Sequence, residues 1–385
     1  MPDIRLAHVI EATVGGTRRH LLDLCHSLPS DRFRQHVICS ARRDERFLED
    51  IARLREAGIE VTLVPMGREI SLAEDWRCLR QIEQILAQWR PDIVQGHSSK
   101  GGFLARLAAR HLRPRPKIVY NPHGFAFQMR TSALKRRLYV ALERYAARWT
   151  DVMVAACESQ KELALQHGIL PDERIRVIPN GIRVEDYEVH IDRATYRREV
   201  GLPEDAKVVG TVAALVSQKN VAGFIQAAAH LCREQERHRD WPPLEVHYAI
   251  AGDGPLRAEL EALAARLGAA EIVHFLGQRR DIPQFLHALD VFALWSLWEG
   301  FPYALLEAGA AGVPVLASDI PGNRDLIEDR VTGRFGVQPG LLVYLTNPEV
   351  AQREAAALSE LVRREYTLER MVEGHVRLYE GLVSA

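Results

Sequence analysis

Three absences narrow the class of protein before any motif is considered. The 385 residues hold 50 Lys and Arg against 51 Asp and Glu, so the net charge is −1 and no overall charge would drive binding to nucleic acid. No run reaches the roughly 18 apolar residues that a transmembrane helix needs. With 47% hydrophobic and 26% charged residues, the composition is that of a globular protein and excludes a disordered chain.

Paired cysteines are also absent. The five cysteines include no C-x-x-C pair, and this pattern predicts free, buried thiols in a reducing compartment. The N-terminus resembles no signal peptide, because a strand-like run begins at Ile4. We therefore expect a cytoplasmic protein. The cysteines are Cys25, Cys39, Cys78, Cys157 and Cys232.

Short apolar runs alternate with longer segments of helical period over nearly the whole chain. The runs are continuously apolar, which indicates parallel strands buried on both faces, and the alternation predicts an α/β fold. Helical segments include 18–28, 72–89, 103–112 and 256–267. The expected strands are 4–10, 34–40, 59–64, 92–97, 117–121, 151–157, 175–179, 207–215, 245–251, 271–276, 291–297 and 313–317.

The strand pattern occurs twice, and the turn sequence Ile178-Pro179-Asn180-Gly181 separates the two series. We therefore expect two doubly wound, Rossmann-like domains, 1–178 and 179–366, that face each other across a cleft. Ligands of such sheets bind at the carboxyl ends of the strands, because loops and helix N-termini converge there. Residues that directly follow strands are thus the candidates for chemistry.

The most informative of these segments is Glu-Gly-Phe-Pro at 299–302, which follows the strand expected at 291–297. Gly300 gives the backbone freedom and Pro302 suits the first turn of a helix, so that backbone amides there could face a phosphate. Glu299 and Glu307 could each accept hydrogen bonds from sugar hydroxyls. Taken alone, the pattern fits a solvated helix with incidental acids somewhat better.

This segment resembles the E-x7-E motif of the family-4 glycosyltransferases, which are retaining enzymes of the GT-B fold that use nucleotide-sugar donors. The order and spacing of further short motifs extend the resemblance over almost the entire chain. These motifs are Gly15-Gly16, His97, Asn121 to Gly124, Val177 to Gly181, Leu215 to Asn220, Ala251 to Pro255, Phe275 to Gly277 and Pro321 to Gly333.

The resemblance implies a role for each matching residue. Glu307 would bind the ribose hydroxyls and Glu299 the donor sugar. Lys219 would neutralise the departing diphosphate, and His123 would lie near the reacting sugar, so His123, Lys219 and Glu299 form the expected catalytic group. The remaining expected donor contacts are Gly15, Gly16, Gly277, Gln278, Arg279, Gly300, Phe301 and Pro302.

The resemblance also implies the reaction. A hexose or N-acetylhexosamine would pass from a nucleoside-diphosphate sugar, with UDP as the expected nucleotide, to an acceptor hydroxyl with retention of configuration. The acceptor, a saccharide or a lipid-linked precursor in polysaccharide or glycolipid assembly, would bind the N-terminal domain and the donor the C-terminal one. A final helix within 367–385 would cross back onto the first domain. We expect no metal or other cofactor, since the sequence has neither a D-x-D pair nor a His, Cys and Asp set at metal-ligand spacing.

Two departures from the family pattern stand out. Where the family has Gly-Arg-Leu, with the arginine on the diphosphate, this chain has Ala213-Ala214-Leu215. Loss of a bidentate phosphate contact would cost about 2–3 kcal/mol unless another cation replaces it, and Arg18, Arg19 and Arg279 are the candidates. The stretch from Gly333 to Arg364 is also about ten residues shorter than the family's usual ending, in a region remote from the donor.

Positive charge gathers in one segment. Residues 101–150 hold eleven Lys or Arg and a single acid, Glu143. The segment could be the solvated face of a helix, and it could also attract an anionic membrane, so that the enzyme would bind the inner face of the cell membrane peripherally. The helix would direct Lys135, Arg136, Arg137, Arg144 and Arg148 to solvent and pack Leu134, Leu138, Ala141, Leu142 and Tyr145 on the sheet.

Two other functions are compatible with parts of the sequence. Gly96 to Gly101 nearly matches the G-x-S-x-G nucleophile elbow of α/β-hydrolases, with Ser98 or Ser99 as the nucleophile, but its second glycine comes one residue late. A non-catalytic protein that only binds a nucleotide-sugar would explain the alanine at position 214. Gly252-Asp253-Gly254 lacks the third glycine of a dinucleotide fingerprint and is expected to form a strand-to-helix turn.

Overall fold

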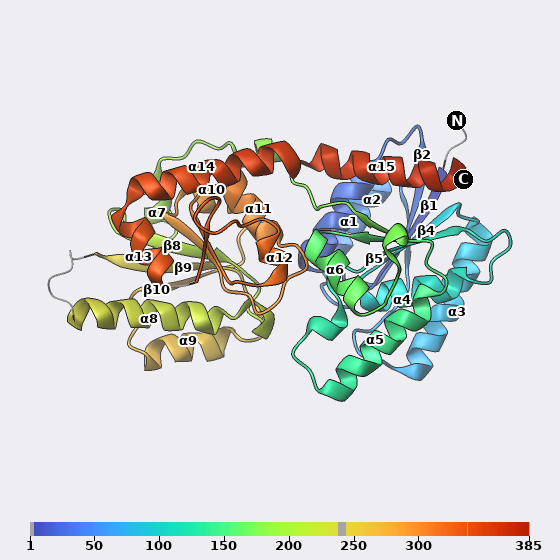
Figure 1. Cartoon of the computed structure of the whole chain (residues 1–385), viewed down its shortest axis with the longest axis horizontal. Coiled ribbons are helices and arrows are strands. Elements are labelled where there is room, and N and C mark those ends of the chain that lie inside the picture. The colour runs from blue at the N-terminus through green and yellow to red at the C-terminus, as the bar shows by residue number, and fades with distance from the viewer. Residues whose placement is uncertain (1–3, 238–243, 337, 385) are drawn as a thin grey trace. The chain divides into compact units, whose positions relative to one another are not determined.

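The computed structural model describes residues 4–237, 244–336 and 338–384, and the chain divides into two compact units (Figure 1). Unit 1 comprises Met1–Asn180 and Leu368–Ala385, and unit 2 comprises Gly181–Thr367. The first boundary therefore falls after residue 180, where we expected it after residue 178, and the second falls after residue 367, where we expected it after residue 366.

Unit 1 is built on a parallel sheet of seven strands in the order β3-β2-β1-β4-β5-β6-β7. The central strands are buried along almost their entire length, as their continuous apolar runs predict. The strands are β1 (Ile4–Ile10), β2 (Phe33–Cys39), β3 (Glu60–Leu63), β4 (Ile93–His97), β5 (Lys117–Asn121), β6 (Val152–Ala155) and β7 (Ile175–Val177).

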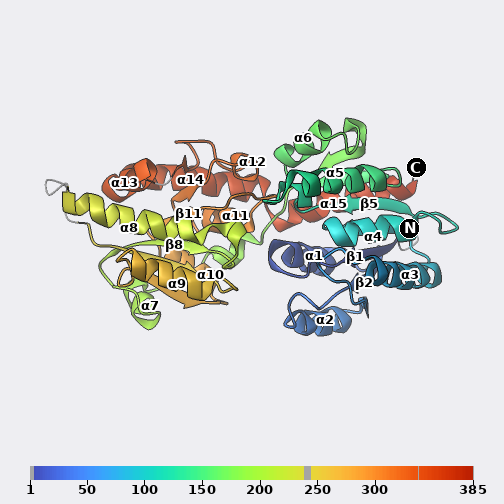
Figure 2. The ribbon, with the colours of Figure 1, turned by 90° about the horizontal axis from the view of Figure 1, so that it is seen from below.

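Helices cover both faces of this sheet, because successive side chains of a strand point to opposite faces. Leu6 of β1 packs in the same core as residues of α1 and α15, whereas Ala7 and Val9 pack against α3 and α4. Figure 2 shows α3, α4 and α5 side by side on one face. The helices are α1 (Gly15–Ser27), α2 (Phe47–Glu56), α3 (Leu72–Trp89), α4 (Ser99–Ala109), α5 (Ala133–Ala147), α6 (Glu158–Gln166) and α15 (Leu368–Ser384), with the short turns η1 (Ala126–Gln128) and η2 (Asp172–Arg174).

The C-terminal helix α15 belongs to unit 1 although it follows unit 2 in sequence. Its apolar face, which includes Leu368, Met371 and Tyr379, shares a buried core with Ile4 and Leu24 from the start of the chain. Tyr379 is completely buried. This hydrophobic burial is the physical reason why the last helix packs onto the first sheet, as the resemblance implied.

Unit 2 is built on a parallel sheet of six strands in the order β10-β9-β8-β11-β12-β13. The two-residue edge strand β13 was not anticipated, because so short a strand carries no periodic signal. The strands are β8 (Lys207–Val212), β9 (Val246–Ala251), β10 (Val273–Gly277), β11 (Val291–Leu294), β12 (Val315–Ala317) and β13 (Arg334–Phe335).

The helices of unit 2 pack around this sheet. The helices and turns are η3 (Val184–Tyr187), α7 (Arg193–Glu199), η4 (Ser217–Lys219), α8 (Val221–Arg237), α9 (Arg257–Arg266), α10 (Ile282–His287), α11 (Tyr303–Ala310), α12 (Pro321–Arg324), α13 (Gln338–Thr346) and α14 (Pro348–Glu365). Gly252 to Gly254 form the turn between β9 and α9, as expected.

The orientation predicted for α5 is wrong. Leu134 and Leu138, which we expected to pack on the sheet, are 78% and 48% exposed, and Tyr145 is also exposed. The buried side of the helix carries Glu143 and Ala146. The stripe that contains Leu134 and Leu138 has helical spacing, but it faces solvent. The side of the helix that carries Glu143 and Ala146 is buried instead, so α5 exposes leucines and cations together.

The basic segment 101–150 is also less uniform than its composition indicates. Arg106 is completely buried, where its guanidinium donates to Glu143 at 2.8 Å and lies over the ring of Tyr120. Arg115 pairs with Asp151, an acid just outside the segment. Arg106 therefore contributes nothing to an exposed basic face, and the charge of the exposed Arg115 is offset by Asp151.

Candidate active site

The carboxyl ends of the unit 2 strands meet at one edge of the sheet, and the loops that follow them pack very closely there. A Cβ atom at Gly322, in α12 after β12, would lie 2.5 Å from the carbonyl oxygen of Gly300, and one at Gly252 would lie 1.9 Å from that of Ala213. No side chain fits at such distances. These two glycines therefore allow the loops after β8, β9, β11 and β12 to form one continuous surface.

Two expected catalytic residues of unit 2 meet on this surface. Lys219, the last residue of η4, places its ammonium nitrogen 2.5 Å from Oε1 of Glu299, which follows β11. The hydroxyl of Ser296 donates to the same oxygen at 2.5 Å. The side-chain nitrogen of Gln218 lies 3.5 Å from Oε2 of the same carboxylate. Glu299 is 8% exposed, so its carboxylate has exchanged most of its water for donors of the protein.

Gln218 ties the two loops together. Its side-chain nitrogen donates to the carbonyl oxygen of Trp298 at 3.0 Å, and its backbone carbonyl oxygen accepts from the backbone nitrogen of Leu297 at 2.8 Å. Because Gln218 precedes Lys219, and Leu297 and Trp298 precede Glu299, these two hydrogen bonds hold Lys219 beside Glu299. Nothing in the sequence singled out Gln218 or Ser296, because their function depends on a neighbour about 80 residues away or on local geometry.

Glu307 occupies the second turn of α11 and is mostly buried, with 9% of its surface exposed. Tyr187, from η3 near the start of unit 2, donates its hydroxyl to Oε1 of Glu307 at 2.9 Å. Pro302, which we expected in the first turn of this helix, is instead the residue that precedes it. Sequence reasoning missed Tyr187, since a lone tyrosine near a domain boundary carries no signal.

The turn Gly277-Gln278-Arg279, expected to bind the base, begins at the last residue of β10. Gly277 has a positive φ of 66°, which favours glycine, and its carbonyl accepts from the backbone nitrogen of Gly252 at 2.7 Å. Arg279 donates to Asp281 at 2.8 Å, and Tyr196 donates to the same carboxylate at 2.9 Å. The guanidinium is thus already neutralised by a neighbour.

The other two cations proposed to replace the family's arginine are also paired. Arg18 donates to Asp50 at 2.5 Å and to Asp44 at 3.1 Å, and Arg19 contacts Asp23 at 3.3 Å. Both arginines lie in α1 of unit 1. Each of the three candidate arginines would therefore have to break its ion pair with an acid before it could bind a diphosphate.

Gly15 and Gly16 were expected in a flexible loop, but they form the first residues of α1. Gly15 has a φ of 53°, in the left-handed region, and a Cβ atom there would meet nothing within 4 Å. Backbone conformation, and not crowding within the chain, therefore requires glycine at position 15. The helix start leaves the amide groups of its first turn without carbonyl partners inside the helix.

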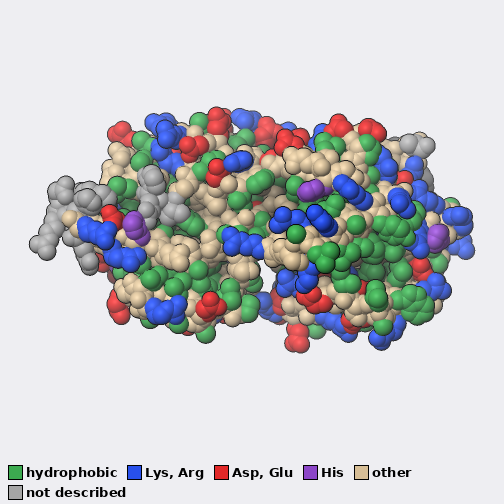
Figure 3. Space-filling view, turned by 60° about the horizontal axis from the view of Figure 1, so that its bottom comes forward, with side chains coloured by type: hydrophobic (Ala, Val, Ile, Leu, Met, Phe, Trp, Pro, Cys, Tyr) green, Lys and Arg blue, Asp and Glu red, His purple; other side chains and the backbone are tan. Residues whose placement is uncertain are grey.

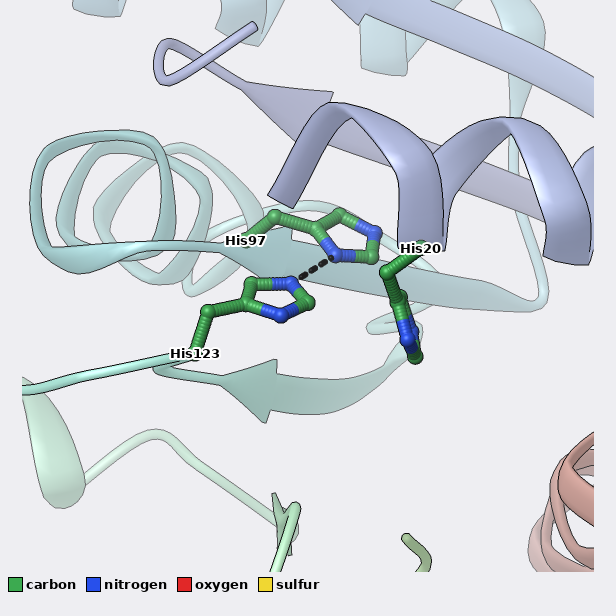
Figure 4. A group of neighbouring side chains, drawn as sticks. All are labelled: His20, His97 and His123. Carbon is green, nitrogen blue, oxygen red and sulfur yellow. Dashed lines mark hydrogen bonds between the residues drawn. The ribbon is translucent and has the colours of Figure 1, made fainter. Parts of the chain in front are cut away.

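Three histidines of unit 1 come together at the carboxyl edge of its sheet (Figure 4). His97 ends β4, His123 follows β5, and His20 projects from α1. Nδ1 of His97 and Nε2 of His123 are 3.0 Å apart, and one nitrogen from each of the three rings lies within 4.8 Å of the others, so the group could hold a metal ion. Motif spacing could not reveal this set, because parallel strands bring together residues that are far apart in sequence.

Burial keeps the histidines of this cluster neutral. Desolvation lowers the pKa of His123 and of the neighbouring His8 from 6.5 to about 3, and that of His375 to about 4. The pKa values of His20 and His97 also lie well below 6.5, first because of burial and then because the other histidines disfavour a positive charge. At neutral pH each ring therefore carries one proton.

The serines near this cluster do not form a hydrolase nucleophile. Ser98 adopts a positive φ of 60°, but its hydroxyl oxygen is buried and has no hydrogen-bond partner among the described residues. Ser99 accepts a hydrogen bond from the backbone nitrogen of Ala126. A serine nucleophile needs an adjacent base, and His97 is instead bonded to His123.

Family models match nearly the whole chain. The Glycosyl transferase 4-like domain matches residues 15–181, and Glycosyl transferases group 1 matches residues 192–362. A galactosyltransferase from Escherichia coli, UDP-Gal:alpha-D-GlcNAc-diphosphoundecaprenol alpha-1,3-galactosyltransferase, is 33% identical over 86% of this chain and 83% of its own length. The putative glycosyltransferase EpsD from Bacillus subtilis is 30% identical over 70% of each chain.

Solved structures agree in fold. Anabaena Alr3699/HepE in complex with UDP and glucose superposes with a TM-score of 0.81 at 22% identity, over 98% of this chain and all of the other. WaaG, a glycosyltransferase involved in lipopolysaccharide biosynthesis, gives 0.74 at 20% identity, over 97% of this chain and 99% of its own. The chain belongs to the family-4 glycosyltransferases of the GT-B fold. It is a glycosyltransferase, as the sequence motifs predicted, and the hydrolase alternative is wrong.

Proposed function

We propose that this glycosyltransferase transfers a hexose or N-acetylhexosamine from a UDP-sugar to a lipid-linked saccharide acceptor, with retention at the anomeric carbon. Unit 2 would bind the donor and unit 1 the acceptor. The observation that carries the donor site is the ion pair between Lys219 and Glu299 at the carboxyl edge of the unit 2 sheet.

This ion pair gives each partner a second role when a donor binds. A diphosphate beside Lys219 would replace Glu299 as the ion-pair partner of the ammonium group, because a diphosphate carries more negative charge than one carboxylate. Glu299 would then be free to accept hydrogen bonds from the sugar, while Ser296 keeps its geometry. Glu307, held by Tyr187, would accept from the ribose hydroxyls.

The proposed chemistry relies on these side chains without a metal. Lys219 would stabilise the negative charge that develops on the leaving diphosphate, the role that a divalent cation has in other enzymes. The leaving phosphate oxygen would help to take the proton of the acceptor hydroxyl on the same face of the sugar. His123 would lie beside the reacting sugar.

A thermal-shift screen tests the donor site. A ligand that binds only the folded protein raises its apparent stability by mass action, so UDP-galactose, UDP-glucose and UDP-N-acetylglucosamine should raise the melting temperature more than GDP-mannose does. The matched variant Glu307→Gln should reduce the shift. Turnover that persists in excess EDTA would support the metal-free route, whereas binding without turnover of any acceptor would favour the non-catalytic alternative.

The acceptor class is inferred from a relative and from a surface of unit 1. The name of the Escherichia coli relative specifies an acceptor sugar on diphosphoundecaprenol, a lipid carrier. No described helix of this chain has the length and hydropathy needed to span a bilayer. We propose that the protein instead binds the inner, cytoplasmic surface of the membrane peripherally through α5.

The exposed side of α5 combines cations with apolar side chains. A hollow of about 640 Å³ is lined by four arginines, His167 and the apolar residues Val140, Ala141 and Tyr145. Leu134 and Leu138 are exposed on the same helix, and Figure 3 shows a hydrophobic area beside Lys and Arg side chains on unit 1. Such a surface fits an anionic headgroup together with acyl chains. The arginines are Arg136, Arg137, Arg144 and Arg148.

Vesicle co-sedimentation separates the contribution of the cations to membrane binding from that of the exposed leucines. Charge reversal at Lys135, Arg136 and Arg137 should weaken binding to phosphatidylglycerol vesicles. Binding of the wild-type protein should fall as salt rises, because surface attraction is screened within about 8–10 Å at physiological ionic strength. The double substitution of Leu134 and Leu138 to Ser should remove the binding that resists salt. If the wild-type protein does not sediment with anionic vesicles at low salt, the acceptor is a soluble saccharide.

A further inference from the structure

We propose that His20, His97 and His123 of unit 1 form a binding site for a divalent transition-metal ion, and that Zn²⁺ is the ion that fits them best. Such a site goes beyond the proposed transfer reaction, in which no metal takes part. Only the effect of the metal on turnover rests on the proposed function, because that effect depends on the position of His123 beside the reacting sugar.

The three imidazoles converge although they come from different elements (Figure 4). Nδ1 of His97 and Nε2 of His123 are 3.0 Å apart, and one nitrogen from each of the three rings lies within 4.8 Å of the others. A tetrahedral zinc ion with Zn–N bonds of about 2.0–2.1 Å holds two ligand nitrogens about 3.4 Å apart. The nitrogens must therefore move by no more than about 1.4 Å relative to one another to hold the ion.

Hydrogen bonds to two asparagines fix the proton of His20. The backbone nitrogen of His123 donates to Oδ1 of Asn121 at 3.3 Å, so the other polar group of that amide is its NH₂. This NH₂ group lies 3.4 Å from Nε2 of His20, which therefore accepts. Oδ1 of Asn180 lies 3.1 Å from Nδ1 of His20, which therefore donates. His20 thus carries its proton on Nδ1 and a lone pair on Nε2.

The contacts behind the rings are those of metal-ligating histidines. A histidine that binds a metal usually donates its other N–H to an acceptor, which fixes the orientation of the ring and its tautomer. Asn180 is this acceptor for His20. Nδ1 of His8 lies 3.1 Å from Nε2 of His97 and can accept a proton there, which leaves Nδ1 of His97 to bind the metal.

Metal binding has to replace two existing contacts. The contact of Asn121 with His20 is long for a hydrogen bond, and the 3.0 Å contact between His97 and His123 needs a proton on one of the two facing nitrogens. That proton can move to the other nitrogen of its own ring, because a neutral imidazole has one proton and one lone pair. The rings are neutral in the buried cluster, so the metal displaces no net proton.

The donor set selects the ion. All three ligands are imidazole nitrogens, which suit Zn²⁺, Ni²⁺ and Cu²⁺, whereas Mg²⁺ and Ca²⁺ prefer oxygen. His20 and His97 are completely buried but His123 is partly accessible, so a water molecule on that side can complete a tetrahedral zinc site. A metal on His123 would withdraw this ring from the reacting sugar. We therefore expect Zn²⁺ to inhibit transfer.

Isothermal titration calorimetry tests the site in the wild-type protein, without a His-tag and dialysed after treatment with EDTA. We expect one Zn²⁺ to bind per chain and Mg²⁺ not to bind. Co²⁺, which commonly replaces zinc, should give the intense visible absorption of a four-coordinate ion. The absence of stoichiometric Zn²⁺ binding, or the weak absorption of octahedral Co²⁺, would overturn the proposal.

Variants identify the ligands. His20→Asn and His123→Asn each remove one imidazole, and asparagine tolerates the left-handed φ of 55° at position 123. Each should weaken Zn²⁺ binding by about 100-fold or more, since changes to outer partners already cost about 10–100-fold. The control is His247→Asn, because Nδ1 of His247 lies 2.8 Å from Nε2 of His274 in a separate histidine pair on unit 2. The control should leave the affinity unchanged.

Wild-type affinity in His20→Asn, or a loss of binding in His247→Asn alone, would assign the bound ion to other residues and overturn the proposal. If neither variant of the cluster folds, the Co²⁺ spectrum of the wild-type protein decides, because it needs no substitution.

The effect on turnover separates this inference from the proposed function. Saturating Zn²⁺ should lower the rate of sugar transfer at least about tenfold, EDTA should restore it, and His20→Asn should resist the inhibition. If Zn²⁺ binds but the protein transfers no sugar, the proposed function fails and the metal site stands. If transfer proceeds and no Zn²⁺ binds, the metal site fails alone. A rate that saturating Zn²⁺ leaves unchanged would overturn the inhibitory role.

Discussion

The ammonium nitrogen of Lys219 lies 2.5 Å from Oε1 of Glu299, a residue 80 positions further along the chain. The loops after β8 and β11 bring these two groups together at the carboxyl edge of the unit 2 sheet. In the proposed function, Lys219 would leave this ion pair to stabilise the negative charge on the departing diphosphate. Four predictions follow from this site, from the position of Ala214 and from the histidine cluster.

Lys219→Ala should lower kcat by about 100-fold or more, because the charge that stabilises the leaving diphosphate is lost. The melting temperature should also fall, because the removal of Lys219 leaves the buried carboxylate of Glu299 with fewer donors. Steady-state kinetics and thermal denaturation measure the two effects. Arg330→Ala, which removes an exposed cation of unit 2, is the control and should leave kcat unchanged. Equal kcat values for Lys219→Ala and wild type would remove Lys219 from the reaction.

Ala214→Arg should tighten UDP-sugar binding or leave it unchanged. Ala214 is exposed, so a longer side chain fits without disturbing the core, and the new guanidinium could bind the diphosphate bidentately. Isothermal titration calorimetry with UDP measures the affinity. Ala214→Gln, of similar length but uncharged, controls for added volume. A marked loss of affinity in Ala214→Arg alone would show that the diphosphate lies against another group in this protein.

Glu307→Ala should weaken donor binding by about 2–3 kcal/mol, because hydrogen bonds to a charged group are lost. Since Glu307 is mostly buried and accepts from Tyr187, we also expect a lower free energy of unfolding. Tyr187→Phe, which removes only the hydroxyl, should weaken binding less and cost about 1 kcal/mol of stability. Calorimetry and urea denaturation measure the two quantities. Unchanged affinity in Glu307→Ala would exclude Glu307 from the donor site.

The histidine cluster should make stability fall steeply as the solution becomes acidic. His8, His123 and His375 have folded-state pKa values of about 3 to 4, whereas in the unfolded chain they titrate near 6.5. Above pH 6.5 neither state is protonated and stability is fully present. Below it the unfolded state gains protons, so each histidine costs about 1.4 kcal/mol per pH unit down to pH 3 to 4.

Urea denaturation between pH 7.5 and 4.5 measures this effect through the number of protons taken up on unfolding. His375→Gln should lower that number by one. A wild-type stability that does not vary from pH 7 to 5 would contradict neutral, buried histidines in the folded state.

Some strand ends were placed too far along the chain by sequence reasoning. The strand expected at 207–215 ends at Val212, and the one expected at 291–297 ends at Leu294. Apolar residues continue beyond both ends because the loops there are themselves buried: Leu215 and Trp295 belong to the core of unit 2. Hydropathy reports burial, and it does not distinguish a buried strand from a buried loop.

The orientation of α5 was mispredicted for a related reason. A helix with apolar residues on more than one side does not reveal from its sequence which side faces the sheet. The contact of Arg106 with Glu143 and Tyr120 selects the other side. That contact joins three elements of unit 1, which no local pattern can encode.

The sequence by itself determined the fold class, the two domains and the family, because buried parallel strands and strand-to-loop motifs depend on residues close together in the chain. It also indicated Lys219, Glu299 and Glu307 individually. Only the tertiary structure decided which groups meet: Lys219 with Glu299, Glu307 with Tyr187, and His97 with His8 and His123. Parallel sheets join residues through long crossovers, so these pairings follow from strand order and register, and not from sequence spacing.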